Sequence, residues 1–180
     1  MMAIMLRPAR LVRLLAGDAL NVARDPMLLL ATGMSLLPAL ALHLAQPAMD
    51  GAALAAFGIV QLSRYLVPLA LLIPAVLIGW VTGFLLLEDR DEGTLLALDI
   101  TPVGKSGFLA YRAGVTALIA AGITFYAWPL ILPGIGVATV ICLAVLVALN
   151  AVGFAVVLPA IARNKVEGLA VTKLTNMVAL

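Results

Sequence analysis

The sequence predicts an all-α protein, a polytopic helix bundle embedded in a membrane, on three observations. Hydrophobic residues make up 64% of the 180 residues and charged residues only 11%, whereas soluble domains contain about 25% charged residues. The mean hydropathy is +1.18. Residues 113–162 contain no charged side chain, and one helix of that length would be about 75 Å long, over twice the thickness of a hydrocarbon core. We therefore expect a single transmembrane domain over 1–180, in which this stretch crosses twice and turns within 129–136.

The first element, residues 6–25, has the pattern of an amphipathic helix lying in the membrane surface. Its basic face would meet the lipid headgroups and its apolar face the acyl chains. An ordinary solvated helix in front of the first span is the alternative. Asp25 followed by Pro26 is typical of a helix start, so we expect the chain to turn there and enter the membrane. The polar residues that recur along this element are Arg7, Arg10, Arg13, Asp18, Asn21, Arg24 and Asp25.

Four stretches are long and apolar enough to cross a bilayer. The connection at 46–64 is expected outside and could contain a short interfacial helix. A further apolar stretch, 168–180, is too short to span and is interrupted by Lys173, so it predicts the start of an incomplete fifth span. The four predicted spans are 27–45, 65–87, 113–130 and 137–162.

The basic residues predict the orientation of these spans. All of them except Arg64 fall in the N-terminal segment, in the loop 88–112 or in 163–173, and basic residues favour the cytoplasmic side. We therefore expect a multi-pass protein of the bacterial inner membrane with a cytoplasmic N-terminus. The net charge of +2 then reflects topology and gives no reason to expect nucleic-acid binding.

Residues with catalytic or metal-binding chemistry are scarce. The chain has one histidine, His43, and one cysteine, Cys142, and the predicted spans contain no carboxylate. A nucleophile with its base, or a metal cluster, cannot be assembled from this set. We predict no catalytic residue, metal site or cofactor, and no enzymatic activity of the chain itself.

Small residues in the spans predict close helix packing. Gly79 and Gly83 are one turn apart in the second predicted span, a spacing that lets two membrane helices approach closely. Asn150 in the fourth predicted span is expected to donate a hydrogen bond between helices. A packing role is favoured over a substrate path for these residues.

The most specific local feature is an acidic segment directly after the second predicted span. Four carboxylates and one arginine stand where basic residues are usual. Docking on a partner with a basic rim is one interpretation. A solvated loop whose acids cap helices is the other, and both remain open on these residues alone. The segment and the positions that follow it are Glu88, Asp89, Arg90, Asp91, Glu92, Gly93, Thr94, Leu95, Leu98, Thr101 and Pro102.

Together with Tyr111-Arg112 and the later Asn164-Lys165-Val166-Glu167-Gly168, this pattern resembles the permease subunit of type 2 ATP-binding-cassette exporters. The resemblance implies six spans behind a cytoplasmic interfacial helix, pairing as a homodimer or heterodimer, and two separate ATPase subunits that hydrolyse ATP. It also implies that residues 88–102 form the segment that couples to the ATPase, and that 6–25 is the connecting helix.

The chain departs from that family pattern at its C-terminal end. A full permease would complete a fifth span and add a sixth, so a truncated copy is expected from 180 residues. A non-transporting scaffold, an accessory subunit or a nonfunctional permease fragment is therefore the alternative to an exporter subunit. The cargo that the composition and the family resemblance suggest is a drug or a lipid-like molecule.

Overall fold

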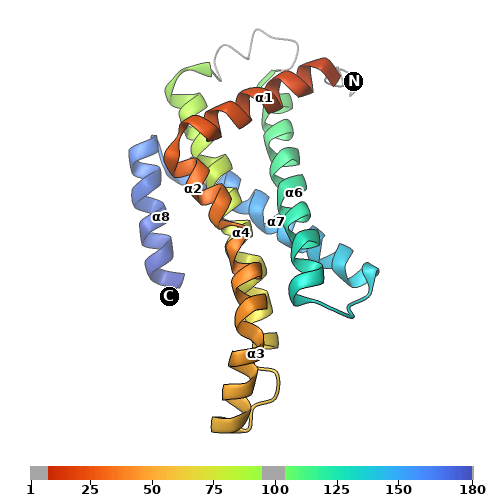
Figure 1. Cartoon of the computed structure of the whole chain (residues 1–180). Helices are drawn as coiled ribbons and strands as arrows, with labels where there is room; N and C mark the ends of the chain where they lie inside the picture. The colour runs from red at the N-terminus through yellow and green to blue at the C-terminus, as the bar shows by residue number, and fades with distance from the viewer. Residues whose placement is uncertain (1–7, 95–103, 180) are drawn as a thin grey trace.

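The computed structural model describes residues 8–94 and 104–179, and every regular element in those ranges is an α-helix (Figure 1). The all-α fold class is thereby confirmed. Four helical stretches have the length and apolarity of a membrane span: Leu28–Phe57, Ser63–Asp91, Gly104–Ile131 and Val137–Ile161. The helices are α1 (Pro8–Arg24), α2 (Pro26–Met34), α3 (Leu37–Phe57), α4 (Ser63–Asp91), α6 (Gly104–Ile131), α7 (Val137–Ile161) and α8 (Lys165–Ala179).

Helix α1 lies across one end of the bundle (Figure 1). Its apolar residues Val12 and Leu20 are exposed, as an acyl-chain contact would require. The chain turns at Asp25, whose Oδ1 accepts a hydrogen bond from the Leu28 N–H at 3.3 Å. Asp25 therefore caps the start of α2 and directs the chain away from the plane of α1.

The first membrane-spanning stretch is interrupted, which the sequence prediction of one span over 27–45 did not anticipate. Helix α2 ends at Met34 and α3 begins at Leu37. The Ser35 hydroxyl donates to the Thr32 carbonyl oxygen at 2.6 Å, and Pro38 in the first turn of α3 has no N–H to continue the ladder. Back-bonding hydroxyls and proline both bend helices, so the break has a local cause.

The helices also extend beyond the predicted spans into polar sequence. Helix α3 continues to Phe57, where the predicted span stopped at 45, and α6 begins at Gly104, well before 113. Asp50 of α3 accepts hydrogen bonds from the Ser63 N–H and hydroxyl, both at 2.8 Å, and so caps α4. The length of an apolar stretch therefore underestimates the length of the helix that contains it.

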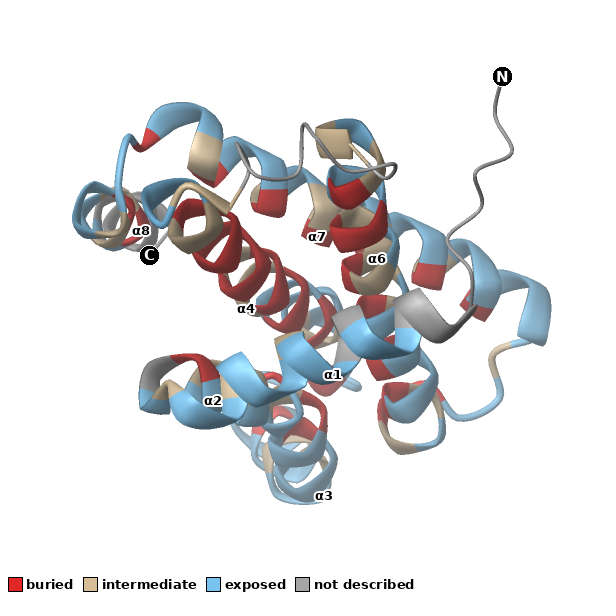
Figure 2. Cartoon of the chain, turned by 90° about the horizontal axis from the view of Figure 1, so that it is seen from above, coloured by how far each residue is buried: buried red, intermediate tan, exposed pale blue. Residues whose placement is uncertain are grey.

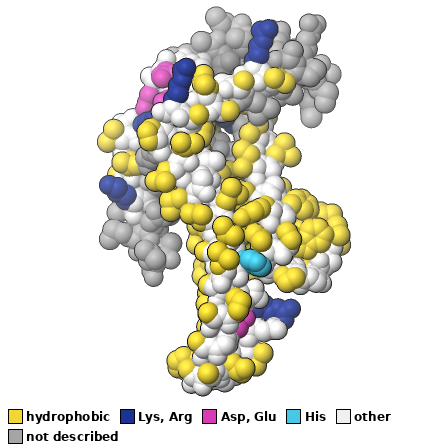
Figure 3. All heavy atoms as spheres, viewed as in Figure 1, with side chains coloured by type: hydrophobic (Ala, Val, Ile, Leu, Met, Phe, Trp, Pro, Cys, Tyr) yellow, Lys and Arg dark blue, Asp and Glu magenta, His cyan; other side chains and the backbone are white. Residues whose placement is uncertain are grey.

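The core of the molecule is α4. About two thirds of its most apolar window is buried, against one third or less in the other three membrane-length stretches, and Figure 2 shows α4 buried along most of its length. Most of the visible charged side chains lie toward the two ends of the molecule, and hydrophobic side chains cover the face between them (Figure 3). The protein is a multi-pass membrane protein in which α4 is the central helix and the outer helices present apolar faces suited to lipid.

Candidate functional site

Polar contacts concentrate where α1 crosses the bundle, at the end that the basic residues predict to be cytoplasmic. The first four residues of the acidic segment, 88–91, form the last turn of α4, and Glu92 and Gly93 form the turn after it. Leu95, Leu98, Thr101 and Pro102 of the predicted coupling segment lie outside the described residues.

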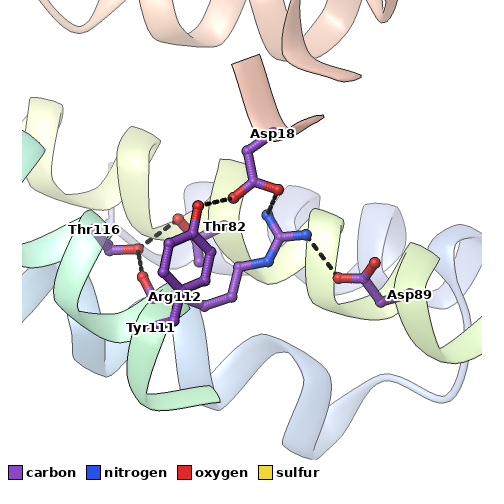
Figure 4. A network of polar contacts seen from close by, with 6 residues as sticks. All are labelled: Asp18, Thr82, Asp89, Tyr111, Arg112 and Thr116. Atoms are coloured by element: carbon purple, nitrogen blue, oxygen red, sulfur yellow. Dashed lines mark hydrogen bonds and ion pairs between the residues drawn. The ribbon is translucent and has the colours of Figure 1, made fainter. Parts of the chain in front are cut away.

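The centre of this polar end is the Arg112 guanidinium, which joins three helices (Figure 4). One terminal nitrogen lies 2.9 Å from Asp18 of α1 and the other 2.7 Å from Asp89 of α4. The Tyr111 hydroxyl donates to Asp18 at 3.0 Å. The Arg112 side chain is only 5% exposed, so its charge depends on these partners rather than on water.

Burial shapes the electrostatics of this cluster. It raises the pKa of Asp18 above its ordinary value, while the Arg112 charge and the Tyr111 hydrogen bond act in the opposite direction. Two carboxylates face one guanidinium, so Asp18, Asp89 and Arg112 together carry a net charge of about −1 when both acids are ionised. The Arg112 carbon Cζ also lies 5.1 Å from the centre of the Phe108 ring, a favourable distance for a cation over an aromatic face.

One turn along α6 from Arg112, two threonine hydroxyls connect α4 to α6. The Thr82 and Thr116 oxygens are 2.7 Å apart, and both residues are buried. The Thr116 hydroxyl donates to the Arg112 carbonyl oxygen at 2.8 Å. Thr116 has one proton, so Thr82 is the donor in the pair and its own oxygen offers lone pairs only.

A second ionic cluster holds the start of α8. Lys165 Nζ lies 3.1 Å from Asp25 and 3.4 Å from Glu88, and the Lys165 N–H donates to Asp91 at 3.1 Å. Burial alone would lower the pKa of Lys165, but the hydrogen bonds and charges of Asp25 and Glu88 outweigh burial and raise that pKa. The ammonium is thus held charged between the α1–α2 junction and the end of α4.

Arg90 binds the C-terminal end of α7. Its two terminal nitrogens donate to the carbonyl oxygens of Pro159, at 3.0 Å, and of Ala162. The last carbonyls of a helix have no partner within the helix, and a basic side chain satisfies them. Arg90 therefore closes the C-terminal end of α7.

The acidic segment is consequently engaged within the chain. Glu88, Asp89, Arg90 and Asp91 each contact another helix or helix end, and Asp91 caps the start of α8. Glu92 is exposed. It borders a polar hollow of about 460 Å³ between α1 and α4 whose lining also includes Asn21, Arg24, Asp25, Glu88 and Asp89.

The glycines predicted to pack helices lie against α7. A Cβ added to Gly79 would come within 2.5 Å of the Ala151 carbonyl oxygen and 2.7 Å of the Phe154 Cβ, and one added to Gly83 would come within 3.0 Å of Leu158. Asn150, expected to donate a hydrogen bond between helices, lies in α7. Its Oδ1 is buried and has no hydrogen-bond partner among the described residues.

Sequence reasoning missed the network around Arg112. Asp18 was assigned only to the polar face of the first helix, and Thr82 and Thr116 were not singled out. One signal was available. Arg112 directly precedes fifty residues without a charge, and an ionisable group at the edge of such a stretch requires a partner.

Comparisons with known proteins agree with this architecture. Residues 18–180 match the sequence model of a family described as fluoroquinolones export permease protein Rv2686c-like. Two proteins of Mycobacterium tuberculosis, the fluoroquinolones export permease proteins MT2760 (strain CDC 1551 / Oshkosh) and Rv2686c (strain ATCC 25618 / H37Rv), are each 34% identical over 110 residues. The match covers 59% of this chain and 43% of each relative, so it spans less than half the length of these curated relatives. No solved structure matches the chain.

Proposed function

We propose, from the premise that this chain belongs to the Rv2686c-like family of fluoroquinolone export permeases, that it forms the membrane-spanning part of an exporter driven by a separate ATP-binding-cassette ATPase. In this proposal the chain supplies the translocation pathway, pairs with a second permease as a homodimer or heterodimer, and leaves ATP hydrolysis to its partner. Its N-terminus, α1 and the end of α4 face the cytoplasm of a bacterial inner membrane.

One structural feature supports the proposal: the last turn of α4 is joined, directly or through one side chain, to α1, α6, α7 and α8. Asp89 reaches α1 through Arg112 of α6, Arg90 caps α7, and Glu88 and Asp91 hold Lys165 of α8. A displacement of this turn would therefore move several rigid helices together. Rigid-body movement of packed helices is a common way to open or close a pathway.

The surface proposed to receive the ATPase is the polar hollow and its rim at Glu92. Several carboxylates line or border it, which suits a basic side chain of a partner, because complementary charges set the register of an interface and the rate of encounter. We include the predicted coupling residues up to Pro102 in this surface as part of the proposal. The cargo proposed is a fluoroquinolone-type drug, following the names of the relatives.

Reversal of the charge at Glu92 tests this surface. In membranes of the host, an ATPase is expected to co-purify with the tagged wild-type chain, and Glu92→Lys is expected to reduce its amount by about tenfold or more, because like charges across an interface cost several kcal/mol. Glu92 is the suitable position since Asp91 also caps α8. The measurement is quantitative mass spectrometry of the purified samples.

Glu167→Lys is the control for the change of charge, because Glu167 is exposed and lies on α8, outside the lining of the hollow. Its carboxylate accepts a hydrogen bond from the Arg163 N–H at 2.8 Å, so the thermal unfolding of both variants is measured beside the co-purification. An equal loss of ATPase in both variants would contradict the assignment of the surface. An ATPase absent from every sample, with the chain inserted and folded, would overturn the exporter proposal and favour a scaffold or accessory role.

A further inference from the structure

A mostly apolar cavity of about 350 Å³ lies beside the Arg112 network, between α1, α2, α4 and α6. Each of these helices contributes apolar side chains to the lining, for example Val22 of α1, Leu29 of α2, Val81 of α4 and Ile119 of α6. Its polar lining residues are Asp18, Thr32, Thr82, Arg112 and Thr116. An apolar chamber with a few grouped polar atoms, in the size range of about 300–1,000 Å³, is typical of sites for small molecules.

Arg112 has one donor that the network leaves unused. Its two terminal nitrogens bind Asp18 and Asp89, but Nε is buried and has no hydrogen-bond partner among the described residues. A buried donor without an acceptor costs about 1–3 kcal/mol. Nε has almost no exposed surface, so a carbonyl oxygen of a molecule in the cavity would recover that free energy only with a small movement of the Arg112 side chain.

The remaining polar atoms of the lining select the charge of the occupant. Thr82 offers lone pairs because its proton is used toward Thr116, and Asp18 offers a carboxylate. With the net charge of about −1 on Asp18, Asp89 and Arg112, a purely anionic molecule such as a fatty acid is disfavoured. A protonated amine beside Asp18 is favoured.

We propose that this cavity binds the cargo as it enters from the adjacent leaflet, and that the cargo is a flat, mostly apolar ring system carrying a carbonyl oxygen and a protonated amine. This inference rests on the proposed function in export. Fluoroquinolones that carry a basic amine have both groups, and because the amine balances their carboxylate they are zwitterions rather than net anions at neutral pH. The cavity proposed for the cargo is separate from the hollow proposed for the ATPase.

The test is binding of norfloxacin to the purified chain in lipid nanodiscs, followed by the fluorescence anisotropy of the drug and corrected with empty nanodiscs. Ile119→Trp places a larger side chain in the cavity and is expected to weaken binding by about tenfold or more. Leu118→Trp is the matched control, because Leu118 is the adjacent residue of α6, is 74% exposed and is not part of the lining; its affinity should stay within about twofold, as expected outside a binding site.

A second readout locates the drug without disturbing the fold. In a Cys142→Ser background, norfloxacin should slow maleimide labelling of Ala19→Cys, which lines the cavity, and leave Ala16→Cys, also exposed on α1, unchanged. Nalidixic acid, which has the oxo-acid ring system but no basic amine, should protect Ala19→Cys at least about tenfold less well, because it lacks the cation that Asp18 attracts.

Equal weakening by both tryptophan variants, absence of protection at Ala19→Cys, or a bound phospholipid that norfloxacin does not displace would each overturn the cargo site. These outcomes are independent of ATPase co-purification. A sample that retains the ATPase but shows no protection refutes only this cavity, whereas protection without any ATPase refutes only the proposed coupling.

Discussion

Replacement of Arg112 by methionine is expected to lower the unfolding temperature of the purified protein by roughly 10 °C or more. The substitution preserves most of the side-chain volume and removes the charge. It leaves Asp18 and Asp89, whose side chains are 18% and 15% exposed, as neighbouring carboxylates without their cation. Breaking a buried ion pair by removing one partner destabilises proteins by about 3–5 kcal/mol. Thermal unfolding in detergent, followed by circular dichroism, measures the change.

Two further variants separate lost charge from lost packing. Adding Asp18→Asn and Asp89→Asn to Arg112→Met removes the uncompensated charges, so the triple variant is expected to recover much of the stability. Arg64→Met, at an exposed arginine of the other end, should leave the transition in place. An Arg112→Met protein that unfolds at the wild-type temperature would show that the network does not hold α1 to the bundle.

The second large effect is expected from one added methyl group at Gly79. Gly79→Ala would place its Cβ within 2.5 Å of the Ala151 carbonyl oxygen, and a backbone atom cannot rotate away as a side chain can. Helices α4 and α7 must therefore separate, and overpacking of this kind costs about 1–3 kcal/mol, sometimes more. Loss of the close contact should appear as a lower unfolding temperature and a smaller yield of monodisperse protein.

Two other glycines make this a graded series. Gly83→Ala meets the movable Leu158 side chain at 3.0 Å, so a smaller loss is expected than at Gly79. Gly153→Ala has no neighbour within 4 Å of the added Cβ. Alanine is the better helix former by about 1 kcal/mol, so that variant should be neutral or slightly more stable. If Gly153→Ala is as harmful as Gly79→Ala, helix contact is not the cause.

The sequence was sufficient for the helical, membrane-spanning character of the chain, because apolarity and the absence of charge act over whole segments. The charge-free stretch 113–162 leads directly to two long helices with a turn between them, α6 and α7. The break at Ser35 and Leu36 was missed because hydropathy does not register a hydroxyl that bonds back to its own helix. The predicted spans also stopped short of the end of α3 and the start of α6, because polar residues continue the hydrogen bonds of a helix as well as apolar ones do.

The polar end of the bundle depends on contacts that sequence periodicity cannot detect. Asp18 and Tyr111 are 93 residues apart, and Asp25 and Lys165 are 140 residues apart. Each of these residues has an ordinary local interpretation as a polar position near a membrane surface. Only the three-dimensional packing of α1, α4, α6 and α8 shows which acidic residue pairs with which basic residue. That packing depends on side-chain shape across the whole bundle.

The ion pairs at this end also set an order of events during synthesis. Ribosomes add about 5–20 residues per second, so the 93 residues between Asp18 and Tyr111 take roughly 5 to 20 seconds to make. Throughout that interval α1 has been made but Arg112 has not, so Asp18 has no guanidinium partner. The ion pair between α1 and α6 can therefore form only after the start of α6 has been synthesised.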